Sequence, residues 1–237
     1  MRILVSADLH ANIIAAEEII NISKKRSCDM HIHIGDSINI GPWPNETIEI
    51  LRNNNVVMLK GNHEEYCTSK GLSNGLLGII SDNELNHHKW TKRLLTQSNI
   101  DYLEKLDYEK TINLAGINIS FLHFFRENNR ISEYNVFEKG IDNNNFDELF
   151  QNENDVIIFG HLHSNIEIVQ NKKYISFGSS GCTGKYCRNK SIGIIETKGN
   201  ALIFEQIQLE WDQDIVRKEL TNKKVPDREL ISAIFLN

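Results

Sequence analysis

Short apolar runs alternate with amphipathic stretches in the first quarter of the chain, and this alternation predicts a parallel β-sheet. Apolar runs at residues 2–7, 29–34 and 56–60 have the length of buried strands. Between them, residues 12–25 and 46–54 carry apolar positions at helical spacing. The order strand, helix, strand, helix, strand with short links indicates parallel strands joined by right-handed crossovers.

The pattern changes after residue 64 and predicts further elements of both kinds. Residues 64–106 are polar and helical and are expected to form an insertion near the functional site. His87 and His88 are adjacent on a helix and point in different directions, which favours surface or packing roles. The hairpin signal at 111–122 and the polar, Asn-rich loop at 126–145 precede a β-rich half with strands near 156–159, 167–170, 174–177, 191–196 and 201–206.

The C-terminal stretch from Trp211 onward is charged and helical, and its end at residues 230–236 is apolar enough to dock on the body or on a partner. We therefore expect a single domain over residues 1–210, with the insertion around 64–106. A helical tail at residues 211–237 is expected to pack on the same domain.

Composition narrows the class of protein. The chain has 237 residues, 40% of them hydrophobic, and a formal net charge of -6. This charge argues against general nucleic-acid binding or a membrane-surface role, because both rely on clustered Lys and Arg. The four cysteines lack paired CxxC spacing, and no targeting segment or membrane-length apolar run is present, so a cytoplasmic protein is expected.

Ligand-type residues follow several of the predicted strands. They are Asp8 and His10, Asp36, Asn62 and His63, His123, and His161 and His163. Strand ends of an α/β fold gather at one edge of the sheet. Carboxylate, imidazole and amide oxygen are ligands for hard or borderline divalent ions, so the pattern favours a polynuclear metal site.

The predicted site contains two pairs of closely spaced ligand residues and one further carboxylate. Asp8 and His10 are two residues apart, as are His161 and His163, and in extended backbone the members of each pair project to the same side. One His pair alone would more often be two buried, hydrogen-bonded imidazoles, but two pairs that each follow a strand favour metal. Asp36 is the best candidate to bridge two ions, which together lower the pKa of a shared water and clamp a phosphoryl group.

In this order, the motifs Asp8-x-His10, Gly35-Asp36, Gly61-Asn62-His63-Glu64, His123 and Gly160-His161-x-His163 resemble those of the calcineurin-like metallophosphoesterase superfamily. The segments from Gly35 to Pro44 and from Phe177 to Gly181 are similar to its small bacterial and archaeal phosphodiesterase branch. The resemblance implies a four-layer α/β/β/α sandwich of two mixed sheets flanked by helices.

The resemblance also implies roles for individual residues. Asp8, His10, Asp36 and His163 would hold one metal ion, and Asp36, Asn62, His123 and His161 the other. His63 would protonate the leaving alkoxide or stabilise the transition state, with Glu64 as its orienting neighbour. Two departures matter: the phosphate-gripping arginine of protein Ser/Thr phosphatases is missing after Asp36, and Phe124 rather than glycine follows His123.

Candidate substrate contacts are Asn12, Arg126 and Lys185. Asn12 could instead cap the helix that begins there, and both basic side chains could be solvated surface charges. Phe124 and Phe125 could form an apolar wall for a substrate group, although such residues more often belong to a core.

The function expected from these features is that of a dinuclear metal-dependent phosphohydrolase, foremost a phosphodiesterase. Its cofactors would be two divalent ions, manganese first, with iron, zinc, nickel or magnesium as alternatives. Its substrate would be a small phosphate ester or a nucleotide-like molecule. A phosphomonoesterase or a dinucleoside polyphosphate hydrolase is the alternative, and a non-catalytic protein-binding module on the same fold is the third reading. The oligomeric state stays open.

Overall fold

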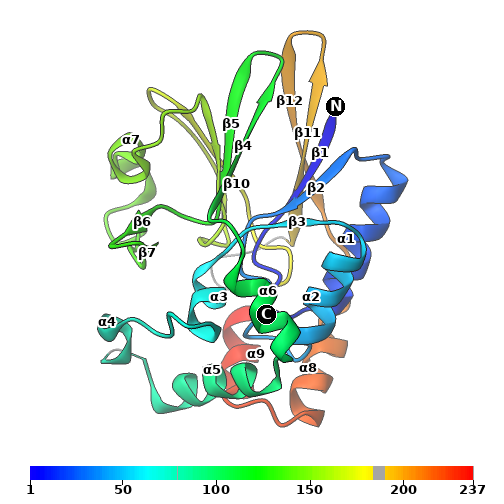
Figure 1. Cartoon of the computed structure of the whole chain (residues 1–237), viewed down its shortest axis with the longest axis vertical. Coiled ribbons are helices and arrows are strands. Elements are labelled where there is room, and N and C mark those ends of the chain that lie inside the picture. Colours follow the sequence, from blue (N-terminus) through cyan, green and yellow to red (C-terminus); the bar gives the residue numbers. More distant parts are fainter. Residues whose placement is uncertain (79, 184–189, 237) are drawn as a thin grey trace.

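Two mixed β-sheets of five strands each lie face to face in the computed structural model, which describes residues 1–78, 80–183 and 190–236 (Figure 1). The first sheet has the strand order β12-β11-β1-β2-β3 and the second the order β4-β5-β8-β10-β9. The first contains β1 (Arg2–Ser6), β2 (Met30–His33), β3 (Val57–Met58), β11 (Ser191–Lys198) and β12 (Ala201–Gln208). The second contains β4 (Glu109–Leu114), β5 (Ile117–Leu122), β8 (Val156–Ile158), β9 (Asn165–Val169) and β10 (Lys173–Phe177).

Parallel strands form the centre of each sheet. Strands β1, β2 and β3 run parallel, as the alternating pattern predicts, and β11 and β12 add antiparallel strands at one edge. Strands β5, β8 and β10 are also parallel, flanked by their antiparallel hairpin partners β4 and β9. The carboxyl ends of the central strands are therefore available to build a common site.

Apolar side chains fill the space between the two sheets. Ile3 and Val5 of β1 face Ile119 and Phe121 of β5 in one buried cluster that also contains Ile158. Leu4, between Ile3 and Val5, belongs to a different cluster on the outer face of the first sheet. This alternation along β1 is the two-residue period of a strand buried on both faces.

Helices cover the two outer faces and complete the four layers. Helix α1 (Ile13–Lys25), α2 (Pro44–Asn53) and α8 (Gln213–Asn222) contribute to the cluster around Leu4. Helix α7 (Phe146–Phe150) packs Phe146 and Phe150 on the outer face of the second sheet. The predicted four-layer α/β/β/α sandwich is confirmed.

The segment between β3 and β4 is helical throughout most of its described length. It contains α3 (Asn62–Cys67), α4 (Asn74–Leu77), α5 (Asp82–Leu94) and α6 (Gln97–Glu104). The side chains of Ser81 and Thr96 accept hydrogen bonds from the first turns of α5 and α6, which explains where these helices begin. Figure 1 shows α4 and α5 at the end of the molecule opposite to the hairpin tips of β4-β5 and β11-β12.

Some element boundaries differ from the predicted ones. Helix α2 begins at Pro44 rather than residue 46, because proline suits the first turn, where no backbone N–H is needed. The predicted loop at 126–145 contains a small antiparallel pair, β6 (Arg126–Glu127) and β7 (Arg130–Ile131), and a 3-10 turn at Ile141–Asn143. These short elements have no apolar pattern that would predict them, since only Ile131 of the small β6-β7 pair is buried.

The C-terminal residues lie against the body of the protein. Val216 and Leu220 of α8 and Ile231 of α9 (Arg228–Phe235) share the cluster that contains Leu4 and Ile19. Within the described ranges, no helix has both the length and the apolar character needed to cross a bilayer.

Candidate metal centre

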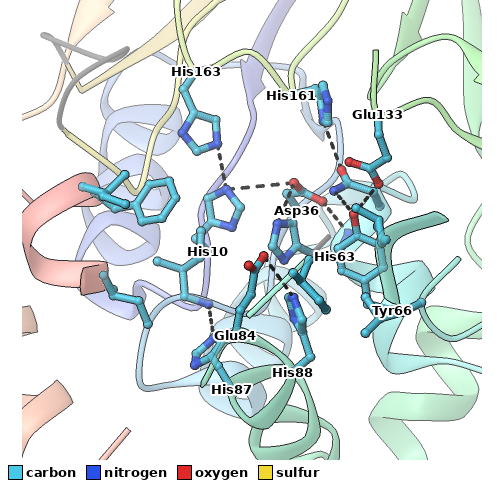
Figure 2. Close-up of a pocket in the computed structure, with 18 of the residues that line it drawn as sticks. His10, Asp36, His63, Tyr66, Glu84, His87, His88, Glu133, His161 and His163 are labelled. Carbon is cyan, nitrogen blue, oxygen red and sulfur yellow. Dashed lines mark hydrogen bonds and ion pairs between the residues drawn. The ribbon is translucent and has the colours of Figure 1, made fainter. Parts of the chain in front are cut away.

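The predicted ligand residues converge although they come from five separate strand ends. Asp8 follows β1, Asp36 follows β2, and Asn62 opens α3 after β3. His123 follows β5, and His161 and His163 follow β8. Figure 2 shows His10, Asp36, His161 and His163 directed toward one another at one end of a cavity.

The backbone at these positions is not extended, which corrects the geometric assumption made from the two-residue spacing. Asp8 and His10 have φ values of 53° and 49°, and His161 and His163 have 68° and 55°. The left-handed conformation costs a non-glycine residue roughly 1 kcal/mol or more, so neighbouring structure must hold it in place. Backbone hydrogen bonds from Asp8 N to Gly35 O (3.1 Å) and from His10 N to Asp36 O (2.9 Å) hold the first pair.

One set of donor atoms contains Asp8, His10, Asp36 and His163. His10 Nε2 lies 2.9 Å from His163 Nε2. Asp8 Oδ1 lies 3.6 Å from His163 Nε2, and Asp36 Oδ2 lies 3.9 Å from His10 Nε2. Metal–ligand bonds of about 2.1 Å place adjacent donor atoms about 3.0–3.4 Å apart, so these four residues have approximately the spacing of a ligand set.

A second set contains Asp36, Asn62, His123 and His161. Asn62 Oδ1 lies 3.0 Å from His123 Nε2 and 3.1 Å from His161 Nδ1. Asp36 Oδ2 lies 3.2 Å from His123 Nε2. Because the same Asp36 oxygen approaches His10 of the first set, Asp36 has the position of a bridging carboxylate.

The local chemistry fits divalent cations. Asp8 Oδ2 is buried and has no hydrogen-bond partner among the described residues. Burial raises the pKa of Asp8 to about 8, because nothing nearby fully replaces the water that a carboxylate loses. A cation supplies the missing partner of such an oxygen.

The imidazoles differ in protonation state. Burial would by itself lower the pKa of His123, but the neighbouring Asp36 outweighs it and raises that pKa to about 10, so this ring carries a proton at neutral pH that a bound metal ion would displace. Burial lowers the pKa of His161 and of His163 to about 3, so both rings are neutral at neutral pH and offer a lone pair. Burial would by itself raise the pKa of Asp36, but the neighbouring His123 and His63 outweigh it and hold that pKa well below the usual range. Asp36 is therefore ionised and available as a ligand.

Glu64 braces the site instead of orienting His63. Its buried carboxylate accepts hydrogen bonds from the backbone N–H groups of Asp36 (2.9 Å), Ser37 (2.7 Å) and Gly61 (2.7 Å). The hydroxyl of Ser37 donates a further one at 2.7 Å. Glu64 thus ties the loop after β2 to the loop after β3, and its expected contact with His63 is replaced by these.

His63 lies beside both donor sets and lines the cavity. Its Nε2 is 3.8 Å from Asp36 Oδ2, and its ring meets that of His10 edge to face with centroids 4.8 Å apart. Burial lowers the pKa of His63 to about 3. The ring is neutral at neutral pH and can donate one N–H hydrogen bond into the cavity.

The structure adds site residues that sequence reasoning missed. Tyr66 Oη accepts a hydrogen bond from Asn62 Nδ2 (2.9 Å) and donates one to Glu133, which orients the Asn62 amide oxygen toward His123. The i, i+4 spacing of Asn62 and Tyr66 on a helix was the signal available for this contact. Cys182 also belongs here, with its sulfur within 4.8 Å of donor atoms of His10 and His163.

Two of the predicted substrate contacts occupy positions outside the cavity lining. Asn12 is buried; its side chain accepts from Ala15 N (3.1 Å) to cap α1 and donates to Gly181 O (3.1 Å). Arg126 is exposed and lies over the ring of Tyr108. Lys185 lies outside the described residues. Substrate contact by any of the three stays a prediction.

His87 and His88 are buried and line the cavity, as does Glu84 (Figure 2). His87 Nε2 accepts a hydrogen bond from Ile40 N at 2.7 Å, and the ring of His88 lies 5.7 Å from that of His63. Phe124 and Phe125 belong to the core, with Phe124 stacked on His161 at 4.6 Å. The cavity has a volume of about 440 Å³.

The ordered ligand motifs and the four-layer fold agree with one family. The sequence model described as calcineurin-like phosphoesterase matches residues 1–165. The chain belongs to this family.

Its relatives and structural neighbours extend the similarity over nearly the whole chain. An uncharacterised protein of Methanocaldococcus jannaschii is 26% identical, over 95% of this chain and 94% of its own. A hypothetical protein of Pyrococcus horikoshii OT3 aligns with a TM-score of 0.79 at 16% identity, covering 100% of this chain and 98% of its own. A metallophosphoesterase from Sphaerobacter thermophilus aligns with a TM-score of 0.71 at 20% identity, covering 98% of each chain. This calcineurin-like phosphoesterase therefore shares its fold beyond the matched motifs, including the C-terminal residues.

Proposed function

We propose that this member of the family is a metal-dependent phosphohydrolase that uses two divalent ions and acts foremost on phosphodiesters. The observation that carries the proposal is the position of Asp36, whose Oδ2 lies 3.9 Å from His10 Nε2 and 3.2 Å from His123 Nε2. One buried carboxylate is thus shared between two nitrogen and oxygen donor sets.

Asp8, His10, Asp36 and His163 would hold one ion, and Asp36, Asn62, His123 and His161 the other. When bound, the two ions would supply positive charge for the phosphate oxygens and lower the pKa of the attacking water. All donors besides Cys182 are nitrogen or oxygen, a set that manganese, iron, zinc, nickel and magnesium can all occupy, and we propose manganese first.

His63 would act on the leaving group. Its ring lines the cavity next to Asp36 and is neutral at neutral pH because burial lowers its pKa to about 3. We therefore favour a hydrogen bond from its N–H to the charge that develops on the leaving oxygen. Asp36 Oδ1 accepts a hydrogen bond from the backbone N–H of His63 at 3.0 Å, which fixes this residue relative to the shared carboxylate.

The proposal has a direct test with bis(4-nitrophenyl) phosphate and added manganese. The wild type should hydrolyse this diester, and Asp36→Asn and His161→Ala should lose both bound metal and turnover. Retained hydrolysis by metal-stripped Asp36→Asn protein would reject the proposal. A parallel panel of phosphate monoesters and dinucleoside polyphosphates separates a phosphodiesterase from the alternative hydrolases.

The reducing cytoplasm is the compartment that we propose for this activity. Cys28 and Cys67, two of the described cysteines, are thiols rather than disulfide members. A chain with this extent of buried core does not depend on disulfides.

A further inference from the structure

The cavity beside the proposed metal centre has apolar walls. Leu72, Leu76 and Ile80, in and around α4, line one side. Leu230, Ile234 and Phe235 of α9 line the other. Phe235 reaches the centre itself, since its ring centroid lies 6.0 Å from that of His163 and 6.5 Å from that of His10. Figure 2 shows α9, in red, beside His10.

These wall residues keep apolar surface in contact with solvent. Leu230 is 50% exposed and Phe137 is 36% exposed, whereas Leu72, Leu76, Ile80 and Ile234 are half-buried. A soluble chain rarely gathers several exposed aliphatic side chains around one hollow without a ligand for them. A cavity of about 440 Å³ lies within the size range of small-molecule sites, roughly 300–1,000 Å³.

The charges around the cavity disfavour a second phosphate. Among the described residues that line it, none is Lys or Arg, whereas Glu84, Glu133 and Asp227 are acidic. Phosphate groups beyond the one held at the metal centre would therefore meet these carboxylates, and no described lining residue offers a cation to offset them. Nucleoside polyphosphates carry several such groups.

We propose that the substrate is a phosphodiester with a single phosphate and an alkyl substituent, which lies between α9 and the side chains of Leu72, Leu76 and Ile80. This inference rests on the proposed phosphodiesterase function and adds the substrate class. The alkyl group would displace water from Leu230, Ile234 and Leu76, which gives a favourable binding term that grows with chain length. The phosphate would lie at the end of the cavity where Asp36 and His63 are found.

The experiment compares methyl, butyl and hexyl 4-nitrophenyl phosphate as substrates of the manganese-loaded full chain. The apparent KM should fall roughly twofold to fourfold for each added methylene until the walls are filled. Diadenosine tetraphosphate should be the poorest substrate by kcat/KM. If KM does not change with chain length while the methyl ester is hydrolysed, the inference is overturned and the proposed function stands.

Two variants of Leu230 test whether the dependence of KM on alkyl chain length arises at this cavity wall. In Leu230→Ser, the ratio of the KM for the methyl ester to the KM for the hexyl ester should be roughly fivefold smaller than in the wild type. Leu230→Arg should raise kcat/KM for diadenosine tetraphosphate, because it adds a cation to the cavity wall. Ile215 on α8 is 43% exposed and is absent from the described lining, so Ile215→Ser and Ile215→Arg are matched controls that should leave both quantities unchanged.

A binding measurement separates the two proposals if no ester is hydrolysed. Calorimetric titration with hexylphosphonate and methylphosphonate needs no turnover, and the hexyl compound should bind at least tenfold more tightly. Equal affinities would overturn the substrate class. Tighter hexyl binding without hydrolysis of any ester would overturn the proposed function, and the cavity would then bind an alkyl phosphate as a ligand and not as a substrate.

Discussion

At the scale of single residues, the candidate centre is built from residues that lie just after strand ends, where the backbone turns sharply. The positions of Asp8, Asp36 and Asn62 after successive parallel strands predicted that these side chains meet, because the ends of such strands share a sheet edge. His161 follows a strand of the second sheet and joins them there. The left-handed backbone of Asp8, Asp36 and His161 was not predictable from spacing. It depends on hydrogen bonds between neighbouring strand ends, such as that from His10 N to Asp36 O.

His63→Ala tests whether this histidine acts on the reaction rather than on the metal. Its Nε2 is 3.8 Å from Asp36 Oδ2 and it is outside the two proposed ligand sets. We expect kcat for bis(4-nitrophenyl) phosphate to fall roughly 10²- to 10³-fold with unchanged metal content. Loss of a metal ion in elemental analysis of this variant would make His63 a ligand instead.

Glu64→Gln tests the brace between the loops after β2 and β3. One Glu64 oxygen accepts from Asp36 N and Gly61 N, and the other accepts from Ser37. An amide NH₂ at either position would face N–H or O–H donors, so we expect a loss of roughly 2–4 kcal/mol in the free energy of unfolding.

Urea denaturation measures this loss, and Glu153→Gln, at an exposed position, serves as the control. A change below about 0.5 kcal/mol for Glu64→Gln, the range of ordinary surface substitutions, would contradict the structural role given to Glu64.

At the scale of elements, the long periodic segments were predictable and the short ones were not. The alternation of strands and helices up to β3 follows from apolar periodicity, and the tail was recognised as helical. Helix α4 has only four residues, and β6 and β7 have only two each, too few for any period to show. That α9 forms a cavity wall could not be read from the chain, because most of the other residues that line the cavity, from His10 to His163, lie more than sixty residues before this helix.

The packing of α8 tests whether the tail belongs to the same cooperative unit. Leu220 is fully buried in the cluster that contains Leu4 and Ile19. Leu220→Ala should lower the free energy of unfolding by about 2–5 kcal/mol and shift a single urea transition. Ile215→Ala, at an exposed position on the same helix, should change it by less than about 0.5 kcal/mol. A separate transition for the tail would show that it is an independent unit.

At the scale of the whole molecule, the centre joins the two sheets. Asp8 and Asp36 follow strands of the first sheet, and His123 and His161 follow strands of the second. His123 Nδ1 also lies 2.9 Å from the carbonyl oxygen of Ile34, so the sheets are linked even by the protein atoms alone. The sandwich architecture was predictable from the motifs in the sequence. The close approach of the two sheets at this edge was seen only in the structure.

Metal binding should therefore stabilise the entire fold. With manganese at about 100 times its dissociation constant, the free energy of unfolding should rise by about 2.7 kcal/mol for each site that binds only the native state. Thermal unfolding of chelator-treated protein, with and without added manganese, measures this gain. Asp36→Asn should show little or none of it, and an equal gain in both proteins would place the ion elsewhere.

Anomalous diffraction from crystals grown with manganese tests the central claim most directly. The account predicts two anomalous peaks about 3.5–4 Å apart, one on each side of the Asp36 carboxylate and each within bonding distance of its donor set. Peaks that lie away from Asp36, or no peak at saturating manganese, would contradict it.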